Sequence, residues 1–150
     1  ESEWDGRPRA LSSGTIDAII AGMSRNEERE ASIDFSDIYW ASDMCVVVRA
    51  DGAYADATSL ADLAGTKLTG QLNTSHYDVL DQITDVNKQE AMESFPQMIV
   101  ALQSGAIDGY TCETPSALSA IAANSELKYL KFEKMNLNLI ELFHFQVVLY

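Results

Sequence analysis

Cysteine, proline and long apolar runs are scarce in this sequence, and each shortage excludes a class of protein. The two cysteines, Cys45 and Cys112, are too few and too irregularly placed for a disulfide framework or a zinc site, so we expect two free or buried thiols. No apolar run reaches the roughly 18 residues that a membrane-spanning helix requires. The N-terminal stretch ESEWDGRPRA lacks the apolar core of a signal peptide, so we expect any signal or lipoprotein segment to be absent from this chain.

Basic residues are few as well. Lysine and arginine together number 10 against 23 acidic residues, which gives a formal net charge of −13. A charge of this sign repels phosphate backbones and anionic membrane surfaces, so we expect no nucleic-acid partner. The remaining composition, 47% hydrophobic and 22% charged over 150 residues, is typical of a soluble globular protein with a core of ordinary size.

One corner of the chain occurs twice. The segments LSSGTIDAII, from Leu11, and LQSGAIDGYT, from Leu102, share the pattern Leu-x-Ser-Gly-x-Ile-Asp. In each copy a glycine, Gly14 or Gly105, can adopt the left-handed conformation that ends a helix, and a short apolar run follows. We expect a helix, a glycine stop, a buried strand and a functional loop in each copy, because open α/β sheets bind ligands at the carboxyl ends of such strands. Two copies predict two lobes that face one cleft.

Strand-like and helix-like segments alternate along the chain, which predicts an α/β fold with a mainly parallel sheet. Strands are expected at IDAIIAG, which we interpret as a buried parallel strand, and at MCVVVR, TKLTGQL and AIDGYTCE. The polar, turn-rich stretch Asp51–Ser59 is the expected lobe boundary. In the tail, apolar residues recur with a period of two from Leu137 to Leu149, which favours a strand. Such a strand crosses back to the first lobe or pairs with another chain, unless the pattern is a sequence accident.

Three blocks of the sequence, taken in order, resemble one protein family. They are SGTIDAIIAGMSRNEEREASIDFSDIYWASDMCVVVR, SLADLAGTKLTGQLNTSHYDVL and ALQSGAIDGYTCETPSAL. Their order is similar to that of the extracytoplasmic amino-acid-binding proteins of bacterial ABC importers, solute-binding protein family 3, over roughly Leu11–Phe132. The resemblance implies the two-lobed, type II periplasmic-binding-protein fold with a hinge between the lobes. It also implies a periplasmic or cell-surface location.

The same resemblance divides the chain into lobes. Residues 1–50 match a partial first lobe with a hinge strand, residues 51–132 a nearly complete second lobe, and residues 133–150 a return strand or an atypical tail. The family's first strand, its first ligand-contacting loop and its closing helices have no counterpart here. A parallel strand that is apolar on both faces invites association at an open edge, so we expect an oligomer or a domain swap in which another copy covers it. We also expect the isolated chain to bind amino acids poorly.

An α-amino acid presents a carboxylate and an ammonium group, and in the first lobe the resemblance implies contacts with both. Arg29 matches the family arginine that binds the ligand carboxylate with two hydrogen bonds. Ser24 matches the residue that assists it through a backbone N–H at a helix start. Gly22 matches a position whose carbonyl accepts a hydrogen bond from the ammonium group, and Met23 follows it in the same loop.

In the second lobe the resemblance implies a loop for the carboxylate and an acid for the ammonium group. Asn73, Thr74 and Ser75 match the loop that caps the carboxylate. Asn73 stands where the family usually has glycine, and asparagine tolerates the left-handed backbone better than most residues. Glu113 stands where the family usually has an aspartate or glutamate that binds the ammonium group.

Several of these residues also have a simpler interpretation. Arg29 follows two glutamates and by charge pattern alone is a solvated helix residue, and Glu113 could be an acid stabilised by a helix N-terminus. His76 has no metal-ligand spacing around it, so an ordinary structural histidine is expected. Tyr39 and Trp40 could line the cleft or fill the core, since aromatic side chains serve both purposes.

The leading hypothesis is a binding module that captures a free polar amino acid between its lobes and delivers it to the permease of an ABC importer. Its mechanism is hinge closure, so we expect no catalytic residue, no metal and no cofactor. Two alternatives stay open. One is a periplasmic dehydratase-like enzyme on the same fold, in which Glu113 or His76 protonates a leaving hydroxyl group. The other is the ligand-sensing lobe of a receptor.

Overall fold

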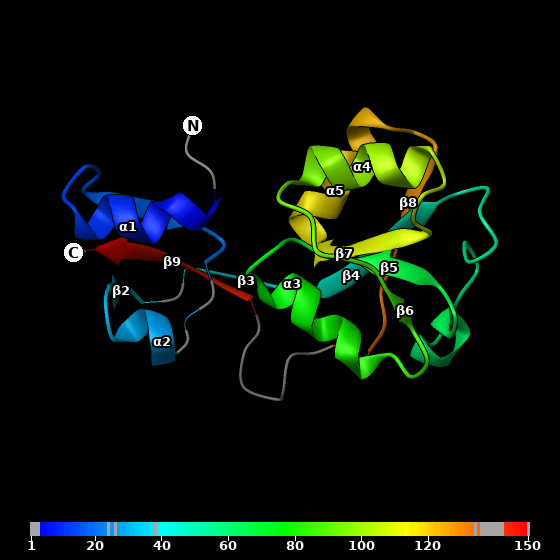
Figure 1. Cartoon of the computed structure of the whole chain (residues 1–150), viewed down its shortest axis with the longest axis horizontal. Helices are drawn as coiled ribbons and strands as arrows, with labels where there is room; N and C mark the ends of the chain where they lie inside the picture. Colours follow the sequence, from blue (N-terminus) through cyan, green and yellow to red (C-terminus); the bar gives the residue numbers. More distant parts are fainter. Residues whose placement is uncertain are drawn as a thin grey trace. The chain divides into compact units, whose positions relative to one another are not determined.

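The computed structural model describes residues 4–23, 25, 27–37, 39–133, 135 and 143–149. The chain divides into two compact units, and Figure 1 shows a sheet with helices in each. Unit 1 comprises Glu1–Ser42 together with Ile140–Tyr150, and unit 2 comprises Asp43–Leu139. The chain therefore changes units between Ser42 and Asp43. The turn-rich stretch from Asp51, where the sequence places the lobe boundary, lies inside unit 2.

Unit 1 is built around the C-terminal strand of the chain. In chain order its elements are η1 (Trp4–Gly6), α1 (Arg7–Ser12), β1 (Ala18–Ala21), α2 (Glu27–Glu30), β2 (Asp34–Phe35), β3 (Trp40–Ser42) and β9 (Phe143–Leu149). β9 lies between β1 and β2, and β3 also pairs with it; all three pairings are antiparallel. The period-two tail is therefore a strand that returns to the N-terminal unit of its own chain. Residues 136–142 of the expected tail strand lie outside the described residues.

The first strand differs from the prediction in two respects. β1 is antiparallel to its partner, with Ile20 opposite Val147, so the expected parallel strand is wrong. It is also buried on one face only, because Ile19 is 4% exposed and Ile20 is 73% exposed. Successive side chains of a strand point to opposite faces, and the face of Ile19 is the one that packs with Leu11 of α1 in the core of unit 1. The edge of β1 that was expected to be covered by another copy is therefore paired with β9 of the same chain.

Unit 2 contains a five-stranded mixed sheet. In chain order its elements are β4 (Met44–Arg49), η2 (Leu60–Leu63), β5 (Lys67–Thr69), α3 (Ser75–Asp78), η3 (Val79–Gln82), β6 (Asn87–Lys88), α4 (Phe95–Gln103), β7 (Gly109–Glu113), α5 (Thr114–Ala123) and β8 (Leu127–Leu130). The strand order is β6-β5-β7-β4-β8. β5 is parallel to β6 and β7, but β4 is antiparallel to both of its neighbours, β7 and β8. The prediction of a mainly parallel sheet fails at β4, which enters between two strands that run the other way.

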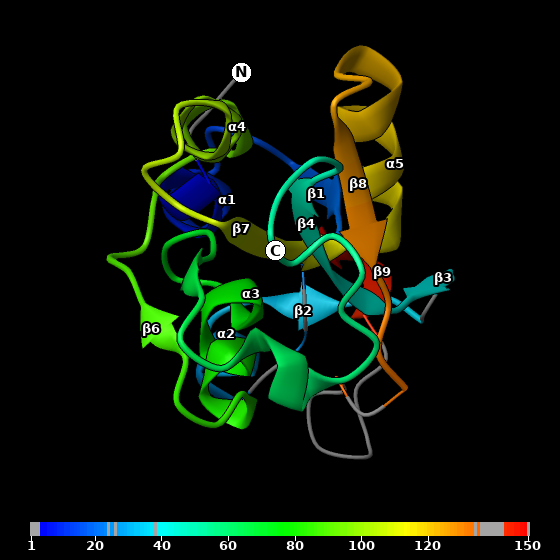
Figure 2. The ribbon, with the colours of Figure 1, turned by 90° about the vertical axis from the view of Figure 1, so that its right-hand side faces the viewer.

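Helices cover both faces of the unit 2 sheet. Figures 1 and 2 show α4 and α5 on one face and α3 on the other. β7 contributes alternate side chains to the two faces: Tyr110 and Cys112 pack in the core with Met98 of α4, whereas the hydroxyl of Thr111 reaches α3. This alternation places Glu113, the last residue of β7, on the α3 face. The alternation of side chains along β7 therefore determines which of them lie on the face of the sheet that α3 covers.

The two copies of the repeated corner have the same backbone structure. Gly14 follows α1 and Gly105 follows α4, and their φ angles of 70° and 76° are in the left-handed region. The N–H of Gly14 donates to the carbonyl of Leu11 at 2.9 Å, and the N–H of Gly105 donates to the carbonyl of Leu102 at 3.1 Å. β1 and β7 then follow. The structure confirms the predicted sequence of helix, glycine stop and strand in both units.

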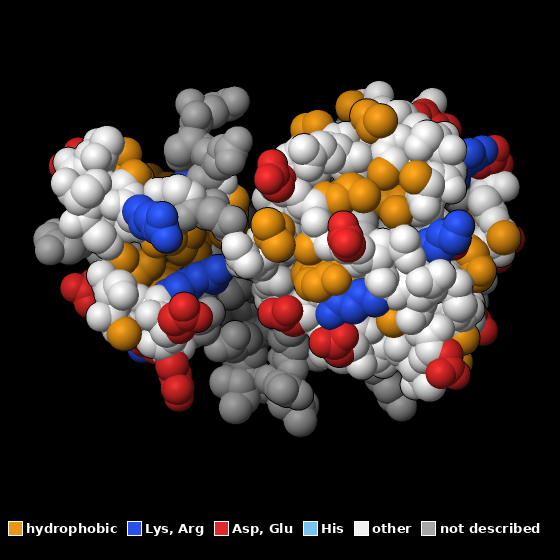
Figure 3. Space-filling view, in the orientation of Figure 1, with side chains coloured by type: hydrophobic (Ala, Val, Ile, Leu, Met, Phe, Trp, Pro, Cys, Tyr) orange, Lys and Arg blue, Asp and Glu red, His pale blue; other side chains and the backbone are white. Residues whose placement is uncertain are grey.

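Acidic side chains are spread over the surface. Figure 3 shows Asp and Glu side chains on both units with uncharged surface between them. We interpret the net charge of −13 as a general property of the surface and not as the signature of one site. Within the described part of the chain, no helix combines the length and the apolar character that crossing a membrane requires.

Candidate functional site

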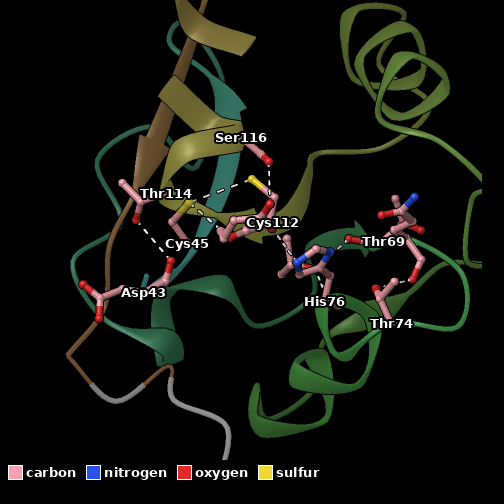
Figure 4. A network of polar contacts seen from close by, with 11 residues as sticks. Asp43, Cys45, Thr69, Thr74, His76, Cys112, Thr114 and Ser116 are labelled. Atoms are coloured by element: carbon pink, nitrogen blue, oxygen red, sulfur yellow. Dashed lines mark hydrogen bonds and ion pairs between the residues drawn. The ribbon is translucent and has the colours of Figure 1, made fainter. Parts of the chain in front are cut away.

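A short contact joins the start of α3 to the end of β7. Nε2 of His76 lies 2.6 Å from Oε2 of Glu113, and the two side chains are 7% and 12% exposed. The other carboxylate oxygen, Oε1, accepts a hydrogen bond of 2.6 Å from the hydroxyl of Ser116 in the first turn of α5. Figure 4 shows this network with His76 and Ser116 labelled. Both oxygens of Glu113 are therefore held in place inside unit 2.

These contacts determine the charge of Glu113. Burial would raise the pKa of the carboxyl above its ordinary value of 4.5. The His76 imidazole, by its contact and its positive charge when protonated, and the Ser116 hydroxyl outweigh burial and lower the pKa of Glu113 to about 2. Glu113 is thus a carboxylate at neutral pH. A buried carboxylate at the carboxyl end of a strand is suited to bind a cationic group such as an ammonium.

The backbone of His76 is fixed as firmly as its side chain. The hydroxyl of Thr111 donates a hydrogen bond to the carbonyl of His76. Gly70 permits this close approach, because a Cβ atom at Gly70 would lie 2.6 Å from the His76 carbonyl oxygen and 2.8 Å from Oγ1 of Thr111. The ring of Phe95 lies beside the imidazole, with 5.9 Å between centroids. The imidazole is therefore held on three sides, by a carboxylate, an aromatic ring and its own anchored backbone.

The loop that the sequence assigns to the ligand carboxylate leads directly into α3. Asn73 has a φ of 56°, which confirms that it takes the left-handed position where the family usually has glycine. Thr74 is the N-cap residue, and its hydroxyl donates to the carbonyl of Gln71 at 2.7 Å, so it closes the loop instead of capping the helix. Ser75 is the first residue of α3. Asn73, Thr74, Ser75 and Glu113 thus lie in one unit, with His76 between the loop and the acid.

The remaining predicted ligand contacts belong to unit 1. Gly22 follows β1, and Arg29 lies in α2 with its side chain partly buried. Met23 is fully buried, and its side chain belongs to the core of unit 1. Ser24 lies outside the described residues. Convergence of the unit 1 residues with Glu113 on one cleft stays a prediction.

The sequence pattern did not predict that His76 contacts Glu113. A lone histidine has no spacing partner, so the pattern favoured an ordinary structural role. The available signal was its position directly after Thr74 and Ser75, in a loop that the resemblance already placed near Glu113. Within the described residues, no group of three or more His, Cys, Asp or Glu side chains could hold a metal ion. His76 instead contacts Glu113, and this contact lowers the pKa of the Glu113 carboxyl. Cys112 has no exposed surface, which confirms that it is buried.

A small pocket lies elsewhere in unit 2. Its volume is about 150 Å³, and Val48, Arg49 and Tyr54 are among the residues that line it. Val48 pairs with Gly109, whereas Met44 at the other end of β4 pairs with Glu113. The pocket and the His76–Glu113 pair are therefore at opposite ends of the β4–β7 ladder, and the pocket is not part of the candidate site.

Comparison with known sequences identifies relatives of the chain. The profile of the bacterial extracellular solute-binding proteins, family 3, matches residues 1–91. A glutamine-binding protein of Geobacillus stearothermophilus is 33% identical over 105 residues, which is 69% of this chain and 38% of that protein. A probable histidine-binding protein of Campylobacter jejuni is 29% identical over 127 residues, 85% of this chain and 48% of that protein. The chain thus spans less than half the length of these two relatives.

Solved structures with a similar fold lead to the same family. A substrate-binding protein of an amino acid ABC transporter has a TM-score of 0.84 at 26% identity, covering 99% of this chain and 63% of that one. An ancestral arginine-binding protein bound to glutamine has a TM-score of 0.79 at 28% identity, covering 98% and 63%. Together with the profile match, these similarities show that the chain has the type II periplasmic-binding-protein fold and belongs to family 3 of the bacterial extracellular solute-binding proteins.

Proposed function

We propose that this chain is the part of an extracytoplasmic binding protein that binds a free polar α-amino acid, which the protein delivers to the permease of an ABC importer. The observation that supports this most directly is the ionised, buried carboxylate of Glu113 at the end of β7. A free amino acid brings the ammonium group that such a carboxylate can bind. Relatives named for glutamine, histidine and L-cystine support a polar side chain on the ligand.

Each proposed contact uses one part of the ligand backbone. Glu113 accepts hydrogen bonds from the ammonium group, since a carboxylate offers about four lone-pair positions and the hydroxyl of Ser116 occupies one of them. Arg29, assisted by Ser24, binds the ligand carboxylate. The remaining contacts come from backbone groups: the carbonyl of Gly22 and the loop Asn73–Ser75. Closure of the hinge brings the two sets together, and no bond is made or broken.

The dehydratase alternative is weakened by the charge of Glu113. An acid that protonates a leaving hydroxyl group must hold a proton near neutral pH. With a pKa of about 2, Glu113 has lost that proton. The relatives named above are binding proteins. The alternative then requires His76 as its acid, and the two observations together favour binding over catalysis as the function of the chain.

Binding is tested by thermal shift with each of the twenty amino acids at millimolar concentration, followed by calorimetry with every amino acid that raises the melting temperature. We expect Glu113→Gln and Arg29→Lys to weaken binding at least tenfold. Glu93→Gln and Arg9→Lys are matched controls, because both side chains are exposed. Because we expect the isolated chain to bind weakly, the screen extends to concentrations that saturate a weak site, and no response there to any amino acid would contradict the proposed function. Wild-type affinity in both site variants would contradict the residue assignment alone.

A further inference from the structure

The two cysteines of the sequence are cross-strand neighbours. Cys45 on β4 lies directly opposite Cys112 on β7 in an antiparallel pair. Their Sγ atoms are 3.9 Å apart, and the thiol of Cys45 also contacts the carbonyl of Cys112 at 3.3 Å. Neither residue has exposed surface. The chain has 150 residues and two cysteines, and the fold brings these two together from positions 67 residues apart. Figure 4 shows both side chains on the sheet.

The strand register is compatible with a covalent bond between them. Directly opposed residues of an antiparallel pair have Cα atoms roughly 4.5–5.5 Å apart, inside the roughly 4.4–6.8 Å range of disulfides. Cys45 and Cys112 belong to the same hydrophobic cluster, so their side chains are on the same face of the sheet. The Sγ atoms need to approach by about 2 Å to reach a bonded distance. Rotation about the two Cα–Cβ bonds provides such a movement without a change of register.

Other uses of the two thiols fit less well. A metal site needs further ligands, and no group of three or more His, Cys, Asp or Glu residues suited to a metal occurs in the described part of the chain. A reactive nucleophile needs a thiolate, but burial and the neighbouring Cys45 raise the pKa of the Cys112 thiol. A disulfide satisfies both sulfur atoms in an apolar core. Disulfides also persist in the extracellular compartment for which the family is named.

We propose that Cys45 and Cys112 form an intramolecular disulfide when the protein matures in an oxidising extracytoplasmic compartment. The oxidant is a second disulfide, carried by a thiol–disulfide oxidoreductase or by glutathione. One cysteine thiolate attacks that disulfide and forms a mixed disulfide, and the other cysteine then displaces the oxidant's sulfur. The two cysteines lose two protons and two electrons, and the oxidant's S–S bond is reduced to two thiols. Because both cysteines are fully buried, the reaction takes place before α4 and α5 cover the sheet.

The bond would tie β4 to β7 one residue before Glu113. It closes a loop between residues 67 positions apart, and a cross-link of this kind restricts the unfolded chain. We therefore expect the oxidised protein to melt several degrees above the reduced protein. The proposal concerns unit 2 alone and does not depend on which ligand the protein binds.

The test is the mass of the chain after export to a bacterial periplasm and denaturation in the presence of N-ethylmaleimide. We expect the exported protein to take up no label and to be about 2 Da lighter than the reduced form. After reduction it should take up two labels. Two labels on most of the exported protein, or a disulfide that links two chains, would overturn the proposal.

Two sets of variants keep the result independent of folding defects. Cys45→Ser and Cys112→Ser each retain one thiol and should take up one label. The double variant Cys45→Ala, Cys112→Ala keeps small side chains in the core, and its melting temperature should not respond to dithiothreitol. The melting temperature of the exported wild type should fall on the same treatment. An equal response of both proteins would also overturn the proposal, because it would show that the reductant acts elsewhere.

Discussion

His76 contacts β7 at two points, with its imidazole against Glu113 and its carbonyl against the hydroxyl of Thr111. Thr111 and Glu113 are two residues apart on one strand, so they point to the same face of the sheet. The first turn of α3 is therefore fixed to the strand that ends at the candidate ligand site. This relationship links the position of the loop Asn73–Ser75 to the charge of Glu113. The contact between His76 and Glu113 can also be tested without a ligand.

The first prediction concerns stability in acid. The pKa of Glu113 is about 2 in the folded protein and has an ordinary value of 4.5, so the folded state binds fewer protons than the unfolded state between these values. The stability from Glu113 is complete above the ordinary pKa and is lost as the pH falls toward 2, by an amount on the order of 3 kcal/mol. Urea denaturation between about pH 5 and pH 2 should show a shallower loss in Glu113→Gln than in the wild type. The exposed Glu93→Gln should keep the wild-type slope, and identical slopes in all three proteins would disprove the expectation.

A second prediction separates the contribution of His76. Burial is the largest influence on Glu113 and raises its pKa, while the imidazole is the main opposing influence. His76→Ala should therefore raise the pKa of Glu113 well above 2. His76→Gln should raise it less, because a glutamine amide can still donate a hydrogen bond to the carboxylate. The measurement is the carbon-13 chemical shift of the Glu113 carboxyl group as a function of pH.

Ser116 provides the matched comparison for that experiment. Its hydroxyl also lowers the pKa of Glu113, but by less than the imidazole. Ser116→Ala should therefore produce a smaller rise than His76→Ala. An unchanged midpoint in His76→Ala, or a larger rise in Ser116→Ala, would show that His76 does not control the charge of Glu113.

The third prediction concerns the close packing of Gly70 against the backbone of His76. Gly70→Ala places a methyl group 2.6 Å from the His76 carbonyl oxygen, so the anchored backbone of α3 must shift. We expect a loss of about 1–3 kcal/mol in the free energy of unfolding, which is typical of overpacking in a tight interior. Gly6→Ala is the control, because a Cβ atom there meets no atom within 4 Å. Chemical denaturation of the two variants should give clearly different midpoints. Equal midpoints would show that the contact between Gly70 and the His76 backbone tolerates a side chain.

Local backbone features of this fold could be predicted from the sequence. Gly14 and Gly105 have φ angles of 70° and 76°, and Asn73 has a φ of 56°. Few residue types adopt the left-handed region without strain, so a glycine or asparagine in a turn pattern already indicates the local geometry. The repeated corner was predicted for the same reason. It needs only residues that are close together in the chain.

Strand direction and side-chain partners could not be predicted in this way. Ile20 pairs with Val147, and no pattern near β1 reveals a partner at the other end of the chain. Glu113 could be predicted from the order of the blocks that resemble the family, but His76 contacts it only because α3 packs beside β7 (Figure 1). The burial of Met23 in the core of unit 1 could not be predicted either, because an apolar residue in a loop after a strand gives no sign of the core that it joins. Each of these outcomes depends on tertiary packing.

The last prediction concerns assembly through β9. β9 lies between β1 and β2 in the sheet of unit 1, with Val147 opposite Ile20, so exchange of β9 between two copies would keep every one of these pairs. Domain swapping is a low-cost route to a dimer for this reason, and we expect the chain to form some dimer at high concentration. Light scattering after size-exclusion chromatography should detect it. Val147→Pro removes a backbone donor from this inner strand, so it should destabilise unit 1 in the monomer and in the exchanged dimer alike. Ile20→Thr is the comparison, since it changes an exposed side chain of β1 and leaves the strand pairing intact. A stable monomer at every concentration would contradict the exchange and leave β9 paired within its own chain.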